Sequence, residues 1–171
     1  AAADVKKEYP KFNLLVLDPL TTTVGCGALV RIALQWRNDG KGLQETYDHI
    51  NSLRLRIQHF IVADDLQYLK KGGRISGAAA AIGGVLGIKP IISFDKQGKL
   101  FVRDKVRGVK KAVSYIKDRM EAEGPDEHNY VFVVHTGNEA VAEELATYVR
   151  VRFGIEPFMQ IMGPVIGSHV G

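Results

Sequence analysis

The chain contains 171 residues, of which 46% are hydrophobic and 25% are charged. This composition is typical of a globular protein and excludes a disordered or fibrous chain. No stretch approaches the ~18 consecutive apolar residues of a membrane-spanning helix, so stable membrane insertion is not expected. The net charge of +4 is concentrated in residues 64–124, which carry 13 basic and 7 acidic side chains. Such a basic region indicates an anionic ligand or an acidic partner, with a solvated surface as the alternative.

The first third of the chain alternates apolar runs with turn-forming residues. The continuous apolar run Phe12–Leu17 predicts a strand buried on both faces, as in a parallel sheet. Threonine and glycine over residues 21–27 predict a turn, and Leu29 then begins a helix that closes at residues 38–40. A second helix and a short strand are expected over residues 43–58 and 60–63.

The character of the sequence changes at Asp64, where we place the boundary between a first domain, residues 1–63, and a second domain, residues 64–171. Asp64 or Asp65 is suited to cap a short helix, which the glycine pair at residues 72–73 ends. The later elements alternate helices with strands, which indicates an α/β or α+β architecture. They are a helix over residues 77–86, strands over 88–94 and 100–107 joined by a turn at 95–98, a helix over 109–120, a strand over 129–135, a helix over 139–153 and a strand over 155–162.

The sequence contains no readable catalytic or metal centre. A single cysteine, Cys26, excludes a disulfide within the chain and is compatible with the reducing cytoplasm, where we expect the protein. Cys26 is either a nucleophile or a small residue at the start of a helix, and the absence of a histidine nearby in sequence favours the second interpretation. The five histidines are scattered without the spacing of a helical metal site, so we expect no metal.

A basic, glycine-rich segment, Lys70–Gly77, could bind an anion. Its glycines let the backbone turn and bring its N–H groups close to a ligand, and Arg74 could hold a carboxylate or phosphate with two hydrogen bonds. The helix expected after Ser76 would add unpaired N–H groups at its positive end. The segment lacks the spacing of a Walker loop and of a G-x-G-x-x-G loop. An ordinary glycine-terminated helix with solvated basic residues is the alternative.

Two further features could belong to a ligand site. The helix expected over residues 77–86 carries no charge, so it must be buried or must face an apolar ligand. Its glycine and alanine side chains would let a thin apolar ligand or another backbone lie close, and simple buried packing is the alternative. His169 lies among glycines at the end of the chain and is either a ligand donor or a turn residue.

The strand expected over residues 100–107 has an alternating basic pattern. Alternate residues of a strand share a face, so strict alternation places four residues in one row with steps of about 6.6 Å: Phe101, Arg103, Lys105 and Arg107. This row could bind nucleic acid, an acidic protein or an acyl phosphate, and a solvated sheet face is the alternative. Only Phe101 offers a stacking surface, so single-stranded nucleic acid is weakly supported. A basic nucleic-acid-binding or regulatory module built on residues 99–111 is the alternative function.

Four short motifs follow one another in a fixed order: Leu-x-Lys-Gly-Gly-Arg-Ile, Ile-Lys-Pro-Ile, Lys-Val-Arg-Gly and Gly-Ser-His-x-Gly. The earlier run LLVLDPLTTTVGCGALV adds an apolar strand, an aspartate and a glycine-rich turn. Together these stretches cover nearly the whole chain. Their ordered combination closely resembles the DegV family, the bacterial fatty-acid-binding proteins that serve a fatty acid kinase.

The resemblance implies an α/β fold with a remnant of a Rossmann-like first domain and a second α/β domain, whose mixed or antiparallel sheet is flanked by helices. It implies a carrier without a catalytic centre of its own, which binds a long-chain fatty acid between the domains. The carrier would present this fatty acid to the catalytic subunit of the kinase, which uses ATP to make an acyl phosphate for phospholipid metabolism. No cofactor and no nucleic acid are implied.

The resemblance also implies roles for individual residues. Arg74, Arg107 and His169 match the family's basic and polar site near the fatty-acid carboxylate and the kinase-docking surface. The neutral helix over residues 77–86 and the strand over residues 88–94 would line the acyl-chain tunnel. Four side chains are expected to form the acyl-chain pocket: Ile82, Val85, Leu86 and Ile92.

The chain departs from the family pattern in several places. The family's early Thr-Ser and Ser-Gly-Thr segments, which hold the carboxylate, are absent, and so is the usual Pro-Gly after the last glycine. Asp18 is followed by Pro19, where the family more often has Asp-Ser. We therefore expect a C-terminal fragment of the family architecture, which keeps part of the tunnel and lacks the carboxylate-binding segments of the first domain.

Overall fold

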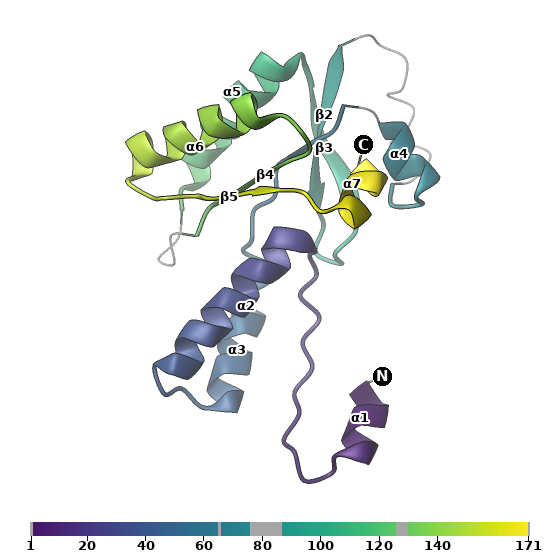
Figure 1. Ribbon diagram of the computed structural model, residues 1–171, viewed down its shortest axis with the longest axis vertical. Coiled ribbons are helices and arrows are strands. Elements are labelled where there is room, and N and C mark those ends of the chain that lie inside the picture. The colour runs from purple at the N-terminus through teal and green to yellow at the C-terminus, as the bar shows by residue number, and fades with distance from the viewer. Residues whose placement is uncertain (1, 65, 76–86, 126–129, 171) are drawn as a thin grey trace. The chain divides into compact units, whose positions relative to one another are not determined.

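The computed structural model (Figure 1) describes four stretches of the chain: residues 2–64, 66–75, 87–125 and 130–170. The chain divides into two compact units, Ala1–Ile57 and Gln58–Gly171. Each unit is described by itself. The division into family domains at Asp64 stays a prediction.

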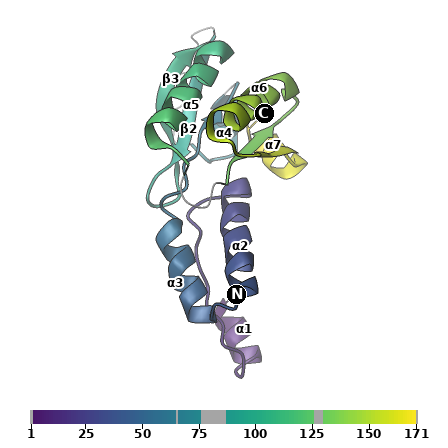
Figure 2. The ribbon, with the colours of Figure 1, turned by 90° about the vertical axis from the view of Figure 1, so that its left-hand side faces the viewer.

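The first unit is built on two helices, α2 (Thr23–Asn38) and α3 (Leu43–Leu53), after the short helix α1 (Ala2–Glu8). In both views of the ribbon α2 and α3 run side by side (Figure 1 and Figure 2). Both predicted helices are therefore confirmed. Trp36 and His49 stack with ring centroids 3.7 Å apart. Each helix buries apolar side chains on one face: Leu29 and Ile32 in α2, and Ile50 and Leu53 in α3. The members of each pair are three residues apart, a spacing that places them on the same side of a helix.

The predicted strand Phe12–Leu17 is wrong. Residues 13–19 have no regular secondary structure, and Phe12 and Val16 are 73% and 58% exposed. A strand forms only when a neighbouring strand completes its backbone hydrogen bonds, and within the described stretches no strand pairs with this run. An apolar composition alone therefore does not make these residues a strand.

The two helices of the first unit differ from their predicted bounds. Because α2 begins at Thr23, five of the seven residues of the turn expected over residues 21–27 are helical. Cys26 consequently lies in the first turn of α2, where it is half-buried. α3 ends at Leu53 and not at residue 58, because the chain turns there and the N–H of Arg56 donates to the carbonyl of Leu53 at 2.8 Å.

The second unit contains an antiparallel sheet of three strands in the order β1 (Ile61–Val62), β2 (Ile88–Phe94) and β3 (Leu100–Arg107). The hairpin between β2 and β3 has the predicted turn. Asp95 Oδ1 accepts hydrogen bonds from the backbone N–H groups of Gln97 and Lys99, at 2.8 and 2.9 Å. Gly98 has a φ of 73°, a conformation that glycine adopts without strain.

Pro90 lies in the central strand, although a proline within a strand indicates an edge or an irregular start. The register resolves this conflict. β1 pairs only with Ile91 and Ile92, so β1 has already ended at the level of Pro90. There β2 pairs with β3 alone, and Pro90 lies opposite Lys105. The missing N–H of the proline therefore leaves no partner in β1 unsatisfied.

A second sheet consists of two parallel strands, β4 (Phe132–His135) and β5 (Phe158–Ile161), and each begins three residues later than predicted. Helix α6 (Glu139–Phe153) connects them, since parallel strands need a crossover of a dozen or more residues. The last helix, α7 (Pro164–Val170), was not predicted. Its glycine content explains this, because glycine lowers helix propensity by about 1 kcal/mol against alanine.

Helix α5 (Val109–Glu123) lies against β2, β3 and α6. Charged side chains are paired between α5 and α6. Arg152 donates two hydrogen bonds to the carboxylate of Glu121, at 2.6 and 2.8 Å. Burial, together with a 2.6 Å hydrogen bond from its hydroxyl to Glu121, raises the pKa of Tyr148 to about 12. These contacts connect the two helices, and they pair the charges of Glu121 and Arg152 with each other.

Candidate ligand-binding site

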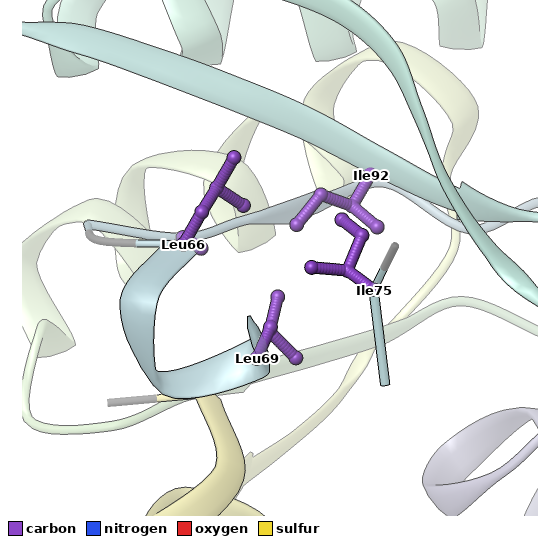
Figure 3. Close-up of a cluster of buried hydrophobic side chains, with 5 residues drawn as sticks. Leu66, Leu69, Ile75 and Ile92 are labelled. Carbon is purple, nitrogen blue, oxygen red and sulfur yellow. The ribbon is translucent and has the colours of Figure 1, made fainter. Parts of the chain in front are cut away.

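A group of buried apolar side chains lies beside the three-stranded sheet (Figure 3). We call it the apolar cluster, and its members are Ala63, Leu66, Leu69, Ile75 and Ile92. Two of them come from the short helix α4 (Leu66–Lys71), which the sequence predicted at this place. Leu66 and Leu69 are three residues apart, so they share one face of that helix.

The glycine pair ends α4, as predicted, and returns the chain to the apolar cluster. Gly73 has a φ of 66°, which glycine adopts without strain. The N–H groups of Gly73 and Arg74 donate to the carbonyls of Lys70 and Leu69, at 3.0 and 2.9 Å. These bonds satisfy carbonyls of the last helical turn. Ile75 then enters the cluster directly after Arg74.

One face of the three-stranded sheet supports the cluster, and we call it the cluster face. Opposite residues of antiparallel strands point to the same face. The register places Ile61 and Val102 opposite Ile92, and both pack against the cluster, as does Val170 of α7. The other face carries Ile91, which is fully buried. Helix α5 lies on that side, and α4 and α7 lie on the cluster side (Figure 1).

A β-bulge interrupts β3 in the middle of its basic residues. Ile91 lies opposite Asp104 and Ile92 opposite Val102, so Arg103 is an extra residue without a counterpart in β2. A bulge of this kind shifts the alternation of the strand by one residue. Beyond the bulge, residues that strict alternation assigns to one face therefore lie on the other.

The bulge contradicts the predicted row of four side chains on β3. Phe101 lies opposite Ser93, which places it on the face of Ile91. Lys105 and Arg107 lie opposite Pro90 and Ile88, so they belong to the cluster face. Phe101 and Lys105 are thus on opposite faces of the sheet. The pattern read as one basic stripe is divided into two.

Arg103 is held within the protein. Its guanidinium donates to Glu123 Oε1 at 2.8 Å and to Gln58 Oε1 at 3.4 Å. The same group lies 5.2 Å from the ring centroid of Phe60, in cation–π geometry. Arg119 also pairs with Glu123. Arg103 therefore serves the fold at the bulge and does not present its charge to a ligand.

The three residues predicted for the basic and polar site are not in contact with one another in the described stretches, and Arg107 lies five residues along β3 from Val102 of the cluster face. Arg74 is exposed, precedes Ile75 of the cluster, and donates to the carbonyl of Gly72 at 2.7 Å. Arg107 is the exposed last residue of β3 on the cluster face. His169 is half-buried in α7, directly before Val170. Arg74 and His169 thus each precede a residue that packs in or against the cluster, whereas the register alone places Arg107 on the cluster face.

The predicted acyl-chain residues are only partly within the described residues. Ile92 is a member of the apolar cluster and is fully buried. Ile82, Val85 and Leu86 lie outside the described residues, as do the helix expected over residues 77–86 and its cap Ser76. The acyl-chain pocket therefore stays a prediction.

Two other sequence interpretations concern charged residues. Asp64, one of the two expected helix caps, forms an ion pair with Lys89 at 2.5 Å, and Asp65 lies outside the described residues. In the part of the chain that the structure describes, no three histidine, cysteine, aspartate or glutamate side chains gather as metal ligands would. Within the same stretches, every helix is too short or too polar to span a membrane.

A comparison with known protein families shows to which family the chain belongs. The chain matches the family described as "Uncharacterised protein, DegV family" over residues 1–171. The chain belongs to the DegV family. The resemblance inferred from the four motifs is thereby confirmed.

Curated DegV relatives match nearly the whole chain. A DegV domain-containing protein of Clostridium perfringens is 33% identical over 174 residues, which cover 100% of this chain and 60% of the relative. One from Lactococcus lactis is 31% identical over 168 residues, covering 98% of this chain and 58% of the relative. The chain thus spans about three-fifths of the length of these relatives.

Solved DegV structures have the same fold. A fatty acid binding DegV family protein of Streptococcus agalactiae has a TM-score of 0.84 at 30% identity, covering 99% of this chain and 60% of its own. A DegV protein of Thermus thermophilus, described by its fatty acid binding, has a TM-score of 0.82 at 26% identity, covering 99% and 61%. A DegV protein of Eubacterium eligens, at 24% identity, has a TM-score of 0.88. The predicted α/β fold class, with mixed sheets and flanking helices, is confirmed.

Proposed function

We propose that the protein is a carrier that binds a long-chain fatty acid and has no catalytic centre of its own. The observation that carries this proposal is the arrangement on the cluster face. The apolar cluster packs on that face, and exposed Arg107 belongs to the same face at the end of β3, which is the combination of apolar and cationic groups that a fatty acid needs. Membership of the DegV family supports it, because the S. agalactiae and T. thermophilus members are described as fatty acid binding.

The affinity would come chiefly from the acyl chain. Each buried methylene contributes about 0.8 kcal/mol, so a sixteen-carbon chain could contribute on the order of 10 kcal/mol. We propose that the chain contacts Ile82, Val85 and Leu86 of the uncharged segment, together with Ile92. Arg74, Arg107 and His169 would lie near the carboxylate end and the kinase-docking surface. Charge-assisted hydrogen bonds from Arg74 and His169 could orient the carboxylate.

We further propose that the carrier delivers its fatty acid to a separate ATP-dependent kinase in the cytoplasm, as a step of phospholipid metabolism. The kinase would transfer the γ-phosphoryl group of ATP to a carboxylate oxygen, so that an acyl phosphate forms and ADP leaves. The sequence supports a division of labour, since it lacks the glycine-lysine spacing of a nucleotide-binding loop. Exposed Arg107 is the proposed contact with the kinase.

The alternative function, a nucleic-acid-binding or regulatory module on residues 99–111, loses support from the register of β3. It required a continuous row of basic side chains on one face. Arg103 is bound to Glu123, and the bulge separates the remaining residues. No observation favours this alternative over the carrier.

Native mass spectrometry of the gently purified protein tests the carrier proposal. The expected result is a population of protein heavier by the mass of one long-chain fatty acid, which disappears after delipidation and returns on addition of palmitate. A spectrum of unliganded protein that does not take up palmitate would count decisively against a carrier. Octanoate serves as the control, because its short chain buries too few methylenes for tight binding.

A further inference from the structure

The chain passes once from the first compact unit to the second, between Ile57 and Gln58. On the first side, the backbone N–H of Arg56 donates to the carbonyl of Leu53, the last residue of α3, at 2.8 Å. The chain is therefore fixed within the first unit as far as Arg56. The three residues that follow Ile57, Gln58–Phe60, have no regular secondary structure and lead into β1, and we call them the connector.

Side chains of the hairpin between β2 and β3 hold all three residues of the connector. The guanidinium of Arg103 donates to Gln58 Oε1 in a long hydrogen bond of 3.4 Å. The same guanidinium lies 5.2 Å from the ring centroid of Phe60, in cation–π geometry. The ring of His59 meets the ring of Phe94 edge to face, with centroids 4.8 Å apart. Two of these three contacts depend on Arg103.

The β-bulge gives Arg103 the position from which it reaches the connector. Arg103 is the extra residue of β3, without a counterpart in β2, and a bulge of this kind redirects the side chain of its extra residue. Glu123, at the end of α5, fixes the guanidinium through an ion pair of 2.8 Å, in which each side chain is 22% exposed. One side chain therefore joins the connector to both β3 and α5.

We propose that Arg103 anchors the connector to the second unit, so that the backbone of Ile57 is the joint of the chain between the two units. Ile57 lies between the last backbone hydrogen bond of the first unit and the contacts of the connector. Arg103 acts through Gln58 and Phe60, so it is a positioning residue. Without its guanidinium the connector leaves the sheet more often, as a local opening that does not require the second unit to unfold. This inference does not depend on the carrier function.

Limited proteolysis of the full chain with trypsin tests this anchor. Trypsin cleaves after Arg56 when the residues on both sides of that bond have left the fold, so at low trypsin the rate follows the population of the opened connector. We expect Arg103→Ala to raise this rate about tenfold, the effect of one lost charge-assisted contact. Mass spectrometry identifies the two products, residues 1–56 and 57–171. An unchanged rate in Arg103→Ala would overturn the inference.

Two variants separate local opening from other effects. Leu69→Ala removes a buried side chain of the apolar cluster and should lower global stability more than Arg103→Ala does. Because it leaves the connector contacts in place, cleavage after Arg56 should rise less than about threefold. A rise as large as that of Arg103→Ala would show that cleavage proceeds through global unfolding, against the inference. Lys105→Gln removes an exposed cation of the same strand and should leave the rate unchanged.

Phe60→Leu tests whether Arg103 acts through the connector. The substitution removes the aromatic ring that the guanidinium contacts, so it should raise the cleavage rate in the same direction as Arg103→Ala. The double variant should be cleaved little faster than Arg103→Ala alone, because both substitutions remove the same contact. Independent effects, in which the two rate increases multiply, would show that Arg103 does not act through Phe60 and would contradict the anchor.

Discussion

The two faces of the three-stranded sheet differ in whether their cationic side chains are paired with acidic ones. On the α5 face, Lys89 pairs with Asp64 and Arg103 pairs with Glu123. On the cluster face, Lys105 and Arg107 have no acidic partner among the described residues. A pair that is satisfied within the chain contributes to the fold, and a cation left unpaired beside apolar side chains remains available to a ligand or a partner. The contrast predicts which substitutions affect stability and which affect binding.

The largest effect is expected from the apolar cluster itself. Leu69 is 2% exposed, so Leu69→Ala removes buried methylenes and leaves a cavity. We expect the free energy of unfolding in urea to fall by about 2–5 kcal/mol. Val151→Ala is the matched control, because Val151 is 83% exposed and should change stability by less than about 0.5 kcal/mol. Equal losses in the two variants would contradict the packing of the cluster.

Arg107→Ala should separate ligand binding from delivery to the kinase. Since the side chain of Arg107 forms no hydrogen bond or ion pair among the described residues, the free energy of unfolding should stay close to that of the wild type. We expect acyl phosphate formation by the kinase at limiting carrier to fall about tenfold, the effect of one lost charge-assisted contact. Palmitate affinity should change less than about threefold. A parallel loss of palmitate affinity and kinase turnover would argue against a docking role.

Arg103→Ala should lower stability and leave ligand binding unchanged, which is the reverse of the result expected for Arg107→Ala. Its effect should be the smallest of the three. It removes the partly buried ion pair with Glu123 and the contact with the ring of Phe60. The free energy of unfolding should fall by about 1–2 kcal/mol, and the palmitate affinity should stay close to that of the wild type.

Much of the second unit could be predicted from local sequence. Helices α5 and α6 follow from apolar spacing, and the hairpin turn follows from Asp95 and Gly98, because these signals act within a few residues. The family motifs correctly indicated the fold. The helix α7 was missed because Gly163 and Gly167 weaken the local helical signal, whereas its contact with α4 is a tertiary one.

The errors concern properties that depend on a partner strand. The run Phe12–Leu17 has the composition of a buried strand, and composition says nothing about whether a neighbour is present to pair with it. The face on which Lys105 lies depends on how β3 aligns with β2, and the residues around Arg103 contain no glycine or other sign of a bulge. The membership of Ile92 in the apolar cluster likewise depends on tertiary packing.

The single additional residue at Arg103 has a consequence for comparing this chain with its relatives. A homologue without that residue must carry its cations one position earlier in the strand to present them at the same place. Alignments that pass through this point without a gap would then equate side chains that point in opposite directions. Residues of β3 that follow Val102 should therefore be matched between these proteins by superposing the strands and not by sequence identity alone.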